Sequence, residues 1–84
     1  MYNIALKKSA VKDLEDINEP FYSVILKNIE TLKENPRNQN VKKLVDRDNE
    51  YRLRSGNYRI LFYIEEKEKK VVVSRVVFRK DAYK

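Results

Sequence analysis

YRLRSGNYRI, residues 51–60, is the stretch that decides the fold, because two alternating runs flank the only glycine of the chain. Residues that alternate with a period of two point to opposite faces of a β-strand. In the first run, Tyr51 and Leu53 would form an apolar face. Arg52 and Arg54 would form a charged face on the other side. Gly56 favours a tight turn between the runs, because glycine tolerates a positive φ. The stretch therefore predicts a β-hairpin with one arginine-bearing face.

Hydrophobic periodicity predicts the elements before this hairpin. Residues 2–6 alternate and indicate a strand with Tyr2, Ile4 and Leu6 on one face. A short helix is expected near residues 9–18, with Ser9 as its N-cap. A second helix would begin near Pro20 and end before Pro36. Its apolar stripe, which we interpret as core, consists of Phe21, Ile25, Ile29 and Leu32.

The second half of the chain reads as strands after an irregular segment. Residues 37–49 are polar, with Val41 and Leu44 expected to pin them to the body of the protein. Strands are predicted at residues 51–54, 58–64 and 70–77, and the tip of the last hairpin at residues 65–69. The expected fold is a single α+β domain over residues 1–84: an N-terminal strand, a two-helix hairpin and a three-stranded antiparallel meander. The helices would pack on one face of a twisted sheet.

The absence of cysteine and histidine narrows the chemistry. Zinc sites of the usual Cys/His types are excluded, as are Ser-His and Cys-His nucleophiles. Chains without cysteine fit a reducing compartment. The longest apolar run of the sheet region, Val71 to Val73, is far shorter than a membrane span, and the N-terminus lacks a signal-peptide pattern. We therefore expect a cytoplasmic protein without a membrane partner.

The net charge of +6 is unevenly distributed along the chain. Residues 1–36 hold five Lys against six Asp/Glu, whereas residues 37–84 hold fourteen Lys/Arg against seven Asp/Glu. All seven arginines lie in the second part. Guanidinium groups bind phosphate in bidentate fashion and stack on flat rings. Arginine that alternates with tyrosine on a strand therefore favours a polyanionic partner such as RNA, although a charge excess alone is often only a solvated surface.

The order of elements and four short motifs resemble the RelE/ParE toxin superfamily, and most closely its RelE branch. The motifs are Lys43-Leu44, YRLR at residues 51–54, GNYRILFY at residues 56–63 and RKDAY at residues 79–83. The resemblance implies a ribosome-dependent endoribonuclease that cuts messenger RNA in the ribosomal A site. It also implies inhibition by a cognate acidic antitoxin encoded beside it, in a toxin–antitoxin hetero-oligomer. ParE-type relatives share the fold but poison DNA gyrase.

The resemblance assigns roles to individual residues. Arg59 would clamp the phosphorane, Arg79 would stabilise the leaving oxygen or deliver its proton, and Tyr83 would stack on a base or relay a proton. Arg54 would lie nearest the general base and, together with Arg52 and Lys43, bind flanking RNA. Two positions depart from the family: arginine replaces a frequent lysine at residues 52 and 54, and Phe78 stands where many relatives carry histidine.

The chemistry of these side chains leaves alternatives open. Arginine suits the stabilisation of phosphorane charge but transfers protons poorly, because its pKa exceeds about 12. Without histidine, Tyr83, with a reference pKa of about 10, is the best titratable candidate. Arg59 could instead form a structural cross-strand pair next to Tyr58, and Tyr83 could be idle close to the chain end. Phe62 and Tyr63 are more consistent with core or sheet-face residues than with base stacking.

No cofactor or metal is expected. Asp46, Asp48 and Glu50 alternate as hard ligands do, but the glycine and distal glutamate of a calcium loop are missing. Glu50 and Asp81 are interpreted as surface counter-charges. Two other functions remain open beside the ribonuclease: a ParE-type gyrase poison, and an RNA- or antitoxin-binding module without activity.

Overall fold

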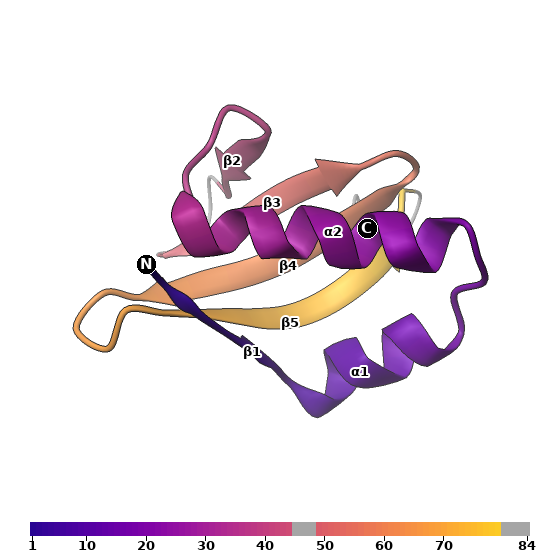
Figure 1. Cartoon of the computed structure of the whole chain (residues 1–84), viewed down its shortest axis with the longest axis horizontal. Coiled ribbons are helices and arrows are strands. Elements are labelled where there is room, and N and C mark those ends of the chain that lie inside the picture. The colour runs from indigo at the N-terminus through magenta and orange to yellow at the C-terminus, as the bar shows by residue number, and fades with distance from the viewer. Residues whose placement is uncertain (45–48, 80–84) are drawn as a thin grey trace.

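Two helices cover one face of a five-stranded sheet in the computed structural model, which describes residues 1–44 and 49–79 (Figure 1). The elements are β1 (Asn3–Leu6), α1 (Lys8–Glu15), α2 (Phe21–Glu34), β2 (Val41–Lys43), β3 (Glu50–Ser55), β4 (Tyr58–Glu65) and β5 (Lys70–Phe78). The strands are ordered β1-β5-β4-β3-β2, and α2 crosses in front of β3 and β4 in Figure 1. The predicted α+β arrangement, with both helices on one side, is confirmed.

The sheet is mixed, and it contains a strand that the sequence did not predict. β1 pairs parallel with β5, whereas the other neighbours pair antiparallel. The prediction that residues 37–49 are irregular is wrong for β2, which pairs with β3. β2 is only three residues long, and its Lys42 and Lys43 are exposed. Such a short segment has no alternation to detect, so its strand geometry depends on the template that β3 provides.

The start of α1 also differs from the prediction. Lys7 occupies the N-cap position without a side-chain cap, and the helix ends at Glu15, three residues before the expected end. Ser9 lies inside the first turn, where its hydroxyl donates to the carbonyl oxygen of Ser74 at 2.6 Å. The polar side chain that resembled a cap therefore ties α1 to β5 instead.

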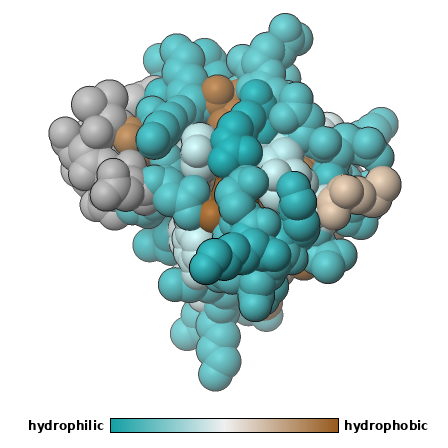
Figure 2. Space-filling view, turned by 90° about the vertical axis from the view of Figure 1, so that its left-hand side faces the viewer, coloured by the Kyte–Doolittle hydropathy of each residue, from teal (hydrophilic) through white to brown (hydrophobic). Residues whose placement is uncertain are grey.

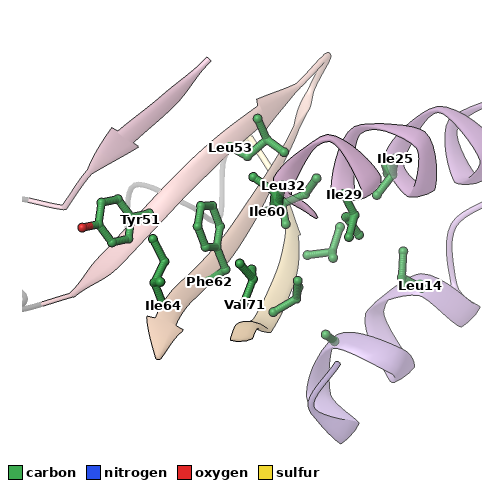
Figure 3. Packing of buried hydrophobic residues seen from close by; sticks show 13 residues of the cluster. Leu14, Ile25, Ile29, Leu32, Tyr51, Leu53, Ile60, Phe62, Ile64 and Val71 are labelled. Carbon is green, nitrogen blue, oxygen red and sulfur yellow. The ribbon is translucent and has the colours of Figure 1, made fainter. Parts of the chain in front are cut away.

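The apolar stripe of α2 packs against the sheet largely as predicted (Figure 3). Ile25, Ile29 and Leu32 are buried, but Phe21, the first member of the stripe, is 54% exposed. On the sheet side the core consists of Tyr51, Leu53, Ile60, Phe62, Ile64, Val71, Val73 and Val76. Each fully buried aliphatic or phenylalanine side chain stabilises the fold by about 1.5–3 kcal/mol. This cluster lies on the helix-covered face, whereas Val72, which is also buried, alternates with Val71 and Val73 and lies on the other face.

A register shift keeps this face continuous along β5. Phe62 pairs with Val73 and Leu61 pairs with Arg75, so Ser74 is the extra residue on β5. The Ser74 hydroxyl donates to the carbonyl oxygen of Leu61 at 3.1 Å. Because of the shift, Val73 and Val76 are both buried although they are an odd number of residues apart. No helix within residues 1–44 and 49–79 is long and apolar enough to cross a membrane.

Candidate functional site

A pocket with a volume of about 240 Å³ lies on the sheet face that the helices leave open. We call it the arginine pocket. Its lining residues are Gln39, Asn40, Lys42, Arg52, Arg54 and Arg59. Four of the six are cationic and two are neutral amides, and none of the lining residues among the described parts of the chain is acidic. This composition suits an anion that also offers hydrogen-bonding groups.

Strand register brings the cationic residues together. Arg52 and Arg54 share one face of β3, as their alternation predicted. In the ladders, Lys42 of β2 pairs with Arg52, and Arg59 of β4 pairs with Arg54. Gly56, which has a φ of +58°, forms the turn that sets the register between β3 and β4. Three adjacent strands therefore direct positive charge toward the same pocket.

Arg59 is buried, with an exposed fraction of only 2%. Its Nη1 donates to the carbonyl oxygens of Gly56 at 3.2 Å and Tyr58 at 3.0 Å. Arg59 alternates with the core residues Ile60 and Phe62 and so lies on the arginine-bearing face of the predicted hairpin. The side chain is fixed by the turn beside it, and it lines the arginine pocket. A charge held in place before a ligand arrives needs little reorganisation to stabilise a developing anion.

Arg37 has a structural role at the opposite end of the molecule. Its Nη1 lies 3.1 Å from Oε1 of Glu66, and its guanidinium carbon lies 5.5 Å from the centre of the Tyr51 ring. The hydroxyl of Tyr51 and the carboxylate of Glu66 raise the pKa of the Arg37 guanidinium. These contacts connect the segment before β2 to the β4–β5 hairpin tip. Hydrophilic residues cover most of the described surface at this end, with a few apolar patches between them (Figure 2).

Arg75 of β5 pairs with Asp13 of α1. Its Nε and Nη2 donate to the two carboxylate oxygens of Asp13 at 2.7 and 3.1 Å, a bidentate geometry. Asp13 also accepts the backbone N–H of Val76 at 2.8 Å. Arg75 therefore serves to dock α1 on the sheet.

Two of the lysine and arginine positions suggested by the resemblance lie outside the pocket lining. Lys43 pairs with Tyr51, so the register places it on the helix side of the sheet. Arg79 is exposed in the turn after β5, and its backbone N–H donates to the carbonyl oxygen of Asn57 at 2.6 Å. This bond places Arg79 beside the β3–β4 turn that also holds Arg59. Tyr83 and Asp81 lie outside the described residues.

An aromatic cluster borders the same turn. Phe78, which occupies the position of the family's frequent histidine, meets Tyr58 edge-on at a centroid distance of 5.3 Å. Phe21 lies 6.2 Å from Tyr58 on the other side. Phe62 is a core residue, as predicted, and Tyr63 is half-buried with Nζ of Lys7 at 5.5 Å from its ring centre.

Gln39, Asn40 and Lys42 were not predicted as site residues. The segment that holds them reads as polar and irregular, so its proximity to Arg52 depends on the unpredicted pairing of β2 with β3. Val41 and Leu44 indicated that the segment is attached to the body of the protein, but the pairing of Val41 with Leu53, which sets the register, is seen only in the structure. Among residues 1–44 and 49–79, no group of three or more carboxylates that could hold a metal ion is present, and Asp46 and Asp48 lie outside that part of the chain.

Comparison with known proteins identifies a protein family whose sequence model matches this chain. Residues 4–83 match the sequence model described as the ParE toxin of the type II toxin–antitoxin system parDE. The chain is also 29% identical over 86 residues to the curated protein RelE1 of Methanocaldococcus jannaschii, covering 99% of this chain and 96% of that protein.

Solved structures show the same fold. The archaeal RelE–RelB complex of Pyrococcus horikoshii contains a chain with 25% identity and a TM-score of 0.81, matched over 93% of this chain and 94% of that one. The toxin–antitoxin complex RelBE2 of Mycobacterium tuberculosis contains a chain with 25% identity and a TM-score of 0.82, matched over 93% and 98%. The similarity therefore extends over nearly the full length on both sides.

Proposed function

Because the chain belongs to the ParE toxin family, within the RelE/ParE superfamily, we propose that it is a toxin of the RelBE type. Its proposed activity is that of a ribosome-dependent endoribonuclease, which cuts messenger RNA in the A site and so inhibits translation. The observation that carries this proposal is the arginine pocket, in which the buried Arg59 lies together with two further arginines.

The proposed reaction uses a hydroxyl of the RNA itself. The 2′-hydroxyl loses its proton to solvent as its oxygen attacks the adjacent phosphorus. A P–O2′ bond forms and the P–O5′ bond breaks, and the departing 5′-oxygen takes up a proton from solvent. The products are a 2′,3′-cyclic phosphate and a 5′-hydroxyl. Arg59 stabilises the extra negative charge of the phosphorane, because its guanidinium is fixed and permanently charged. Arg52 and Arg54 bind the flanking phosphates, and Arg79 stabilises the departing oxygen. Tyr83 stacks on a base or relays a proton.

The ribosome supplies what the pocket lacks. The chain has no histidine, so no side chain with an unperturbed pKa near neutrality is present for proton transfer. Charge stabilisation alone is effective only when the hydroxyl and the scissile bond are in line. Holding reactants in such geometry is worth about 7–11 kcal/mol of barrier. We therefore propose that the ribosome positions the codon and that the toxin stabilises the transition state.

The proposed partner is a cognate acidic antitoxin encoded adjacently. The Pyrococcus horikoshii and Mycobacterium tuberculosis relatives were both crystallised as complexes with antitoxins. In this chain, residues 37–84 carry a charge of +7, from fourteen Lys/Arg and seven Asp/Glu. Carboxylates of an acidic partner would pair with guanidinium groups of the open face, which favours fast and specific association.

A second candidate function is gyrase poisoning, because the matching family model is that of ParE toxins. A gyrase poison needs a binding surface but no phosphorane stabilisation. A protein–protein contact of this kind needs a broad surface, whereas the guanidinium of Arg59 is fixed inside a pocket. This arrangement suits phosphate chemistry and therefore favours the ribonuclease over the gyrase poison.

Primer extension on a translated message, with and without ribosomes, tests the proposal. We expect cuts at codon boundaries with ribosomes and almost none on naked RNA. A codon with a 2′-deoxy sugar at the cut position should resist cleavage, since the attacking hydroxyl is missing. Absence of cuts on translated messages, together with inhibition of gyrase supercoiling, would replace the ribonuclease with the second candidate.

A further inference from the structure

We propose that Asn40 and Gln39 read the edge of one RNA base, preferentially adenine, next to the phosphate held in the arginine pocket. The proposal rests on the RNA-binding function proposed above and extends it to sequence preference. It starts from the uneven composition of the pocket lining. The cations come from the three strands β2, β3 and β4, whereas both amides come from the segment that precedes β2.

The amide groups are available for a ligand. Gln39 and Asn40 are exposed, and neither side chain makes a hydrogen bond to a described residue. Each amide offers a donor and an acceptor side by side. A guanidinium, in contrast, offers only donors and matches phosphate oxygens. The pocket thus combines groups that bind any RNA backbone with groups that discriminate between bases.

The segment that carries the amides is well ordered by local hydrogen bonds. Asn35 Oδ1 accepts the backbone N–H of Arg37 at 3.1 Å, and Asn38 Nδ2 donates to the Asn35 carbonyl at 3.2 Å. Asn38 Oδ1 accepts the backbone N–H of Asn40 at 2.9 Å, and the backbone N–H of Val41 donates to the Asn38 carbonyl at 3.0 Å. Three of these bonds use the side chains of Asn35 and Asn38, and they replace the backbone pairing that a loop otherwise lacks. The amides therefore sit on a preorganised support.

One further bond sets the position of the amides relative to the phosphate site. The backbone N–H of Arg54 donates to the carbonyl oxygen of Asn40 at 3.4 Å. Arg54 also lines the pocket and faces the same side as Arg59. A residue that binds phosphate and a residue that can read a base are thus joined through their backbones. Such a link fixes the spacing between backbone recognition and base recognition.

Adenine is the base that fits this pair of groups best. An Asn or Gln amide forms two hydrogen bonds with the N6 and N7 atoms of adenine, and single-stranded RNA exposes these edges. The amides and the cations line one cavity of about 240 Å³, so a base edge and its neighbouring phosphate could be bound side by side. Neutral amides also avoid the repulsion that a carboxylate would impose on the phosphate.

The test compares four variants in two assays. Asn40→Ala and Gln39→Ala remove one amide each, and Asn40→Asp preserves the shape while replacing the amide donor with a carboxylate. Asn3→Ala removes an exposed asparagine at the far edge of the sheet, on β1, and is the matched control. One assay maps cut sites on ribosomes across a library of codons. The other measures the Kd of wild-type and variant toxin for short single-stranded RNAs that differ in one base.

We expect the preference for adenine over pyrimidine to fall by about 5- to 150-fold in Asn40→Ala, the value of one bidentate base contact. Asn40→Asp should shift the preference toward cytosine, whose N4 amino group donates to a carboxylate. Asn3→Ala should retain the wild-type preference, and melting temperatures identify any variant that is not folded. An unchanged base preference in both Ala variants and in Asn40→Asp would overturn the inference.

The two assays separate this inference from the proposed function. If wild-type toxin does not cut on ribosomes but its RNA binding favours adenine through Asn40, the ribonuclease proposal fails and the base-reading inference stands. If cutting occurs with the same codon spectrum in wild type and variants, the ribonuclease proposal stands and the inference fails. Wild-type protein that binds all the RNAs equally also refutes it.

Discussion

The two faces of the β3–β4 hairpin share one backbone but differ in the charge and the packing of their side chains. Leu53 pairs with Ile60 on the helix-covered face, and one residue further along, Arg54 pairs with Arg59 on the open face. Leu53 and Ile60 belong to the core, whereas Arg54 and Arg59 line the arginine pocket. The comparison shows how a small domain can carry a charged site without interrupting its core. Because strand residues alternate between the two faces, one residue packs in the core and its neighbour lines the site.

The largest expected effect is on the covered face. Leu53→Ala and Ile60→Ala each leave a cavity under α2, so we expect a loss of about 2–5 kcal/mol in the free energy of unfolding. Urea or thermal melts measure this loss. Cleavage or RNA binding per folded molecule should remain at the wild-type level. Loss of RNA binding in fully folded Leu53→Ala protein would contradict the division between the faces.

The next largest effect concerns Arg59 on the open face. Arg59→Ala should reduce ribosome-dependent cutting by about 10²–10³-fold, because a fixed charge-stabilising donor is lost. Since Arg59 is buried and donates to the carbonyl oxygens of Gly56 and Tyr58, the melting temperature should fall too. Rates must therefore be normalised to the folded fraction.

Arg75→Ala is the matched control for Arg59→Ala. It removes an arginine from the adjacent strand, one that is bound to Asp13 of α1 rather than directed into the pocket. We expect Arg75→Ala to lower stability without changing the cutting rate of folded protein. Equal losses of rate in the two variants would show that overall positive charge, rather than the position of Arg59, governs activity.

Most of the fold was predictable because its signals are local and repeated. The alternation in β3 and β4, the glycine turn and the stripe of α2 each appear over several residues, and all three are present in the structure. The misassigned features depend on tertiary contacts. Ser9 resembled a cap but bonds to β5, and Phe21 continues the apolar stripe of α2 but meets Tyr58 while remaining exposed.

The candidate site was predictable only where it lies on long strands. Arg52, Arg54 and Arg59 follow from alternation alone, and the structure places all three in one pocket. The burial of Arg59 was not predictable, because it results from bonds to the carbonyls of the turn beside it. Likewise, the face that each residue of a three-residue strand occupies cannot be read from the sequence. Only the observed register shows that Lys42, rather than Lys43, lies on the face of the arginine pocket.

These two lysines give a smaller, sharper test of the comparison between faces. Lys42 lines the arginine pocket, whereas Lys43 pairs with Tyr51 on the helix side, and both are exposed. Each phosphate neutralised on a single strand contributes about −0.7 to the slope of log K against log salt concentration. Titration of single-stranded RNA at several salt concentrations should show a slope reduced by about 0.7 in Lys42→Ala and unchanged in Lys43→Ala. The reverse result would restore the position suggested by the family resemblance.

The smallest expected effect lies at the hairpin tip, where charge serves structure. The Tyr2 hydroxyl, at 3.0 Å from Oε1 of Glu66, and then Arg37 hold the pKa of the Glu66 carboxyl below its ordinary value of 4.5.

A carboxyl whose pKa is lower in the folded state stabilises the fold above its unfolded pKa, and this contribution disappears as the pH falls through the folded pKa. Glu66→Gln should therefore melt slightly below wild type at neutral pH, and the two melting temperatures should converge as the pH falls through the lowered pKa of folded Glu66. Tyr2→Phe should shift the pKa of Glu66, followed by NMR, back toward 4.5. A Glu66 pKa at or above 4.5 in the wild-type protein would show that this contact does not hold in solution. RNA binding should be unchanged in Glu66→Gln, because the residue lies outside the pocket that the open face forms.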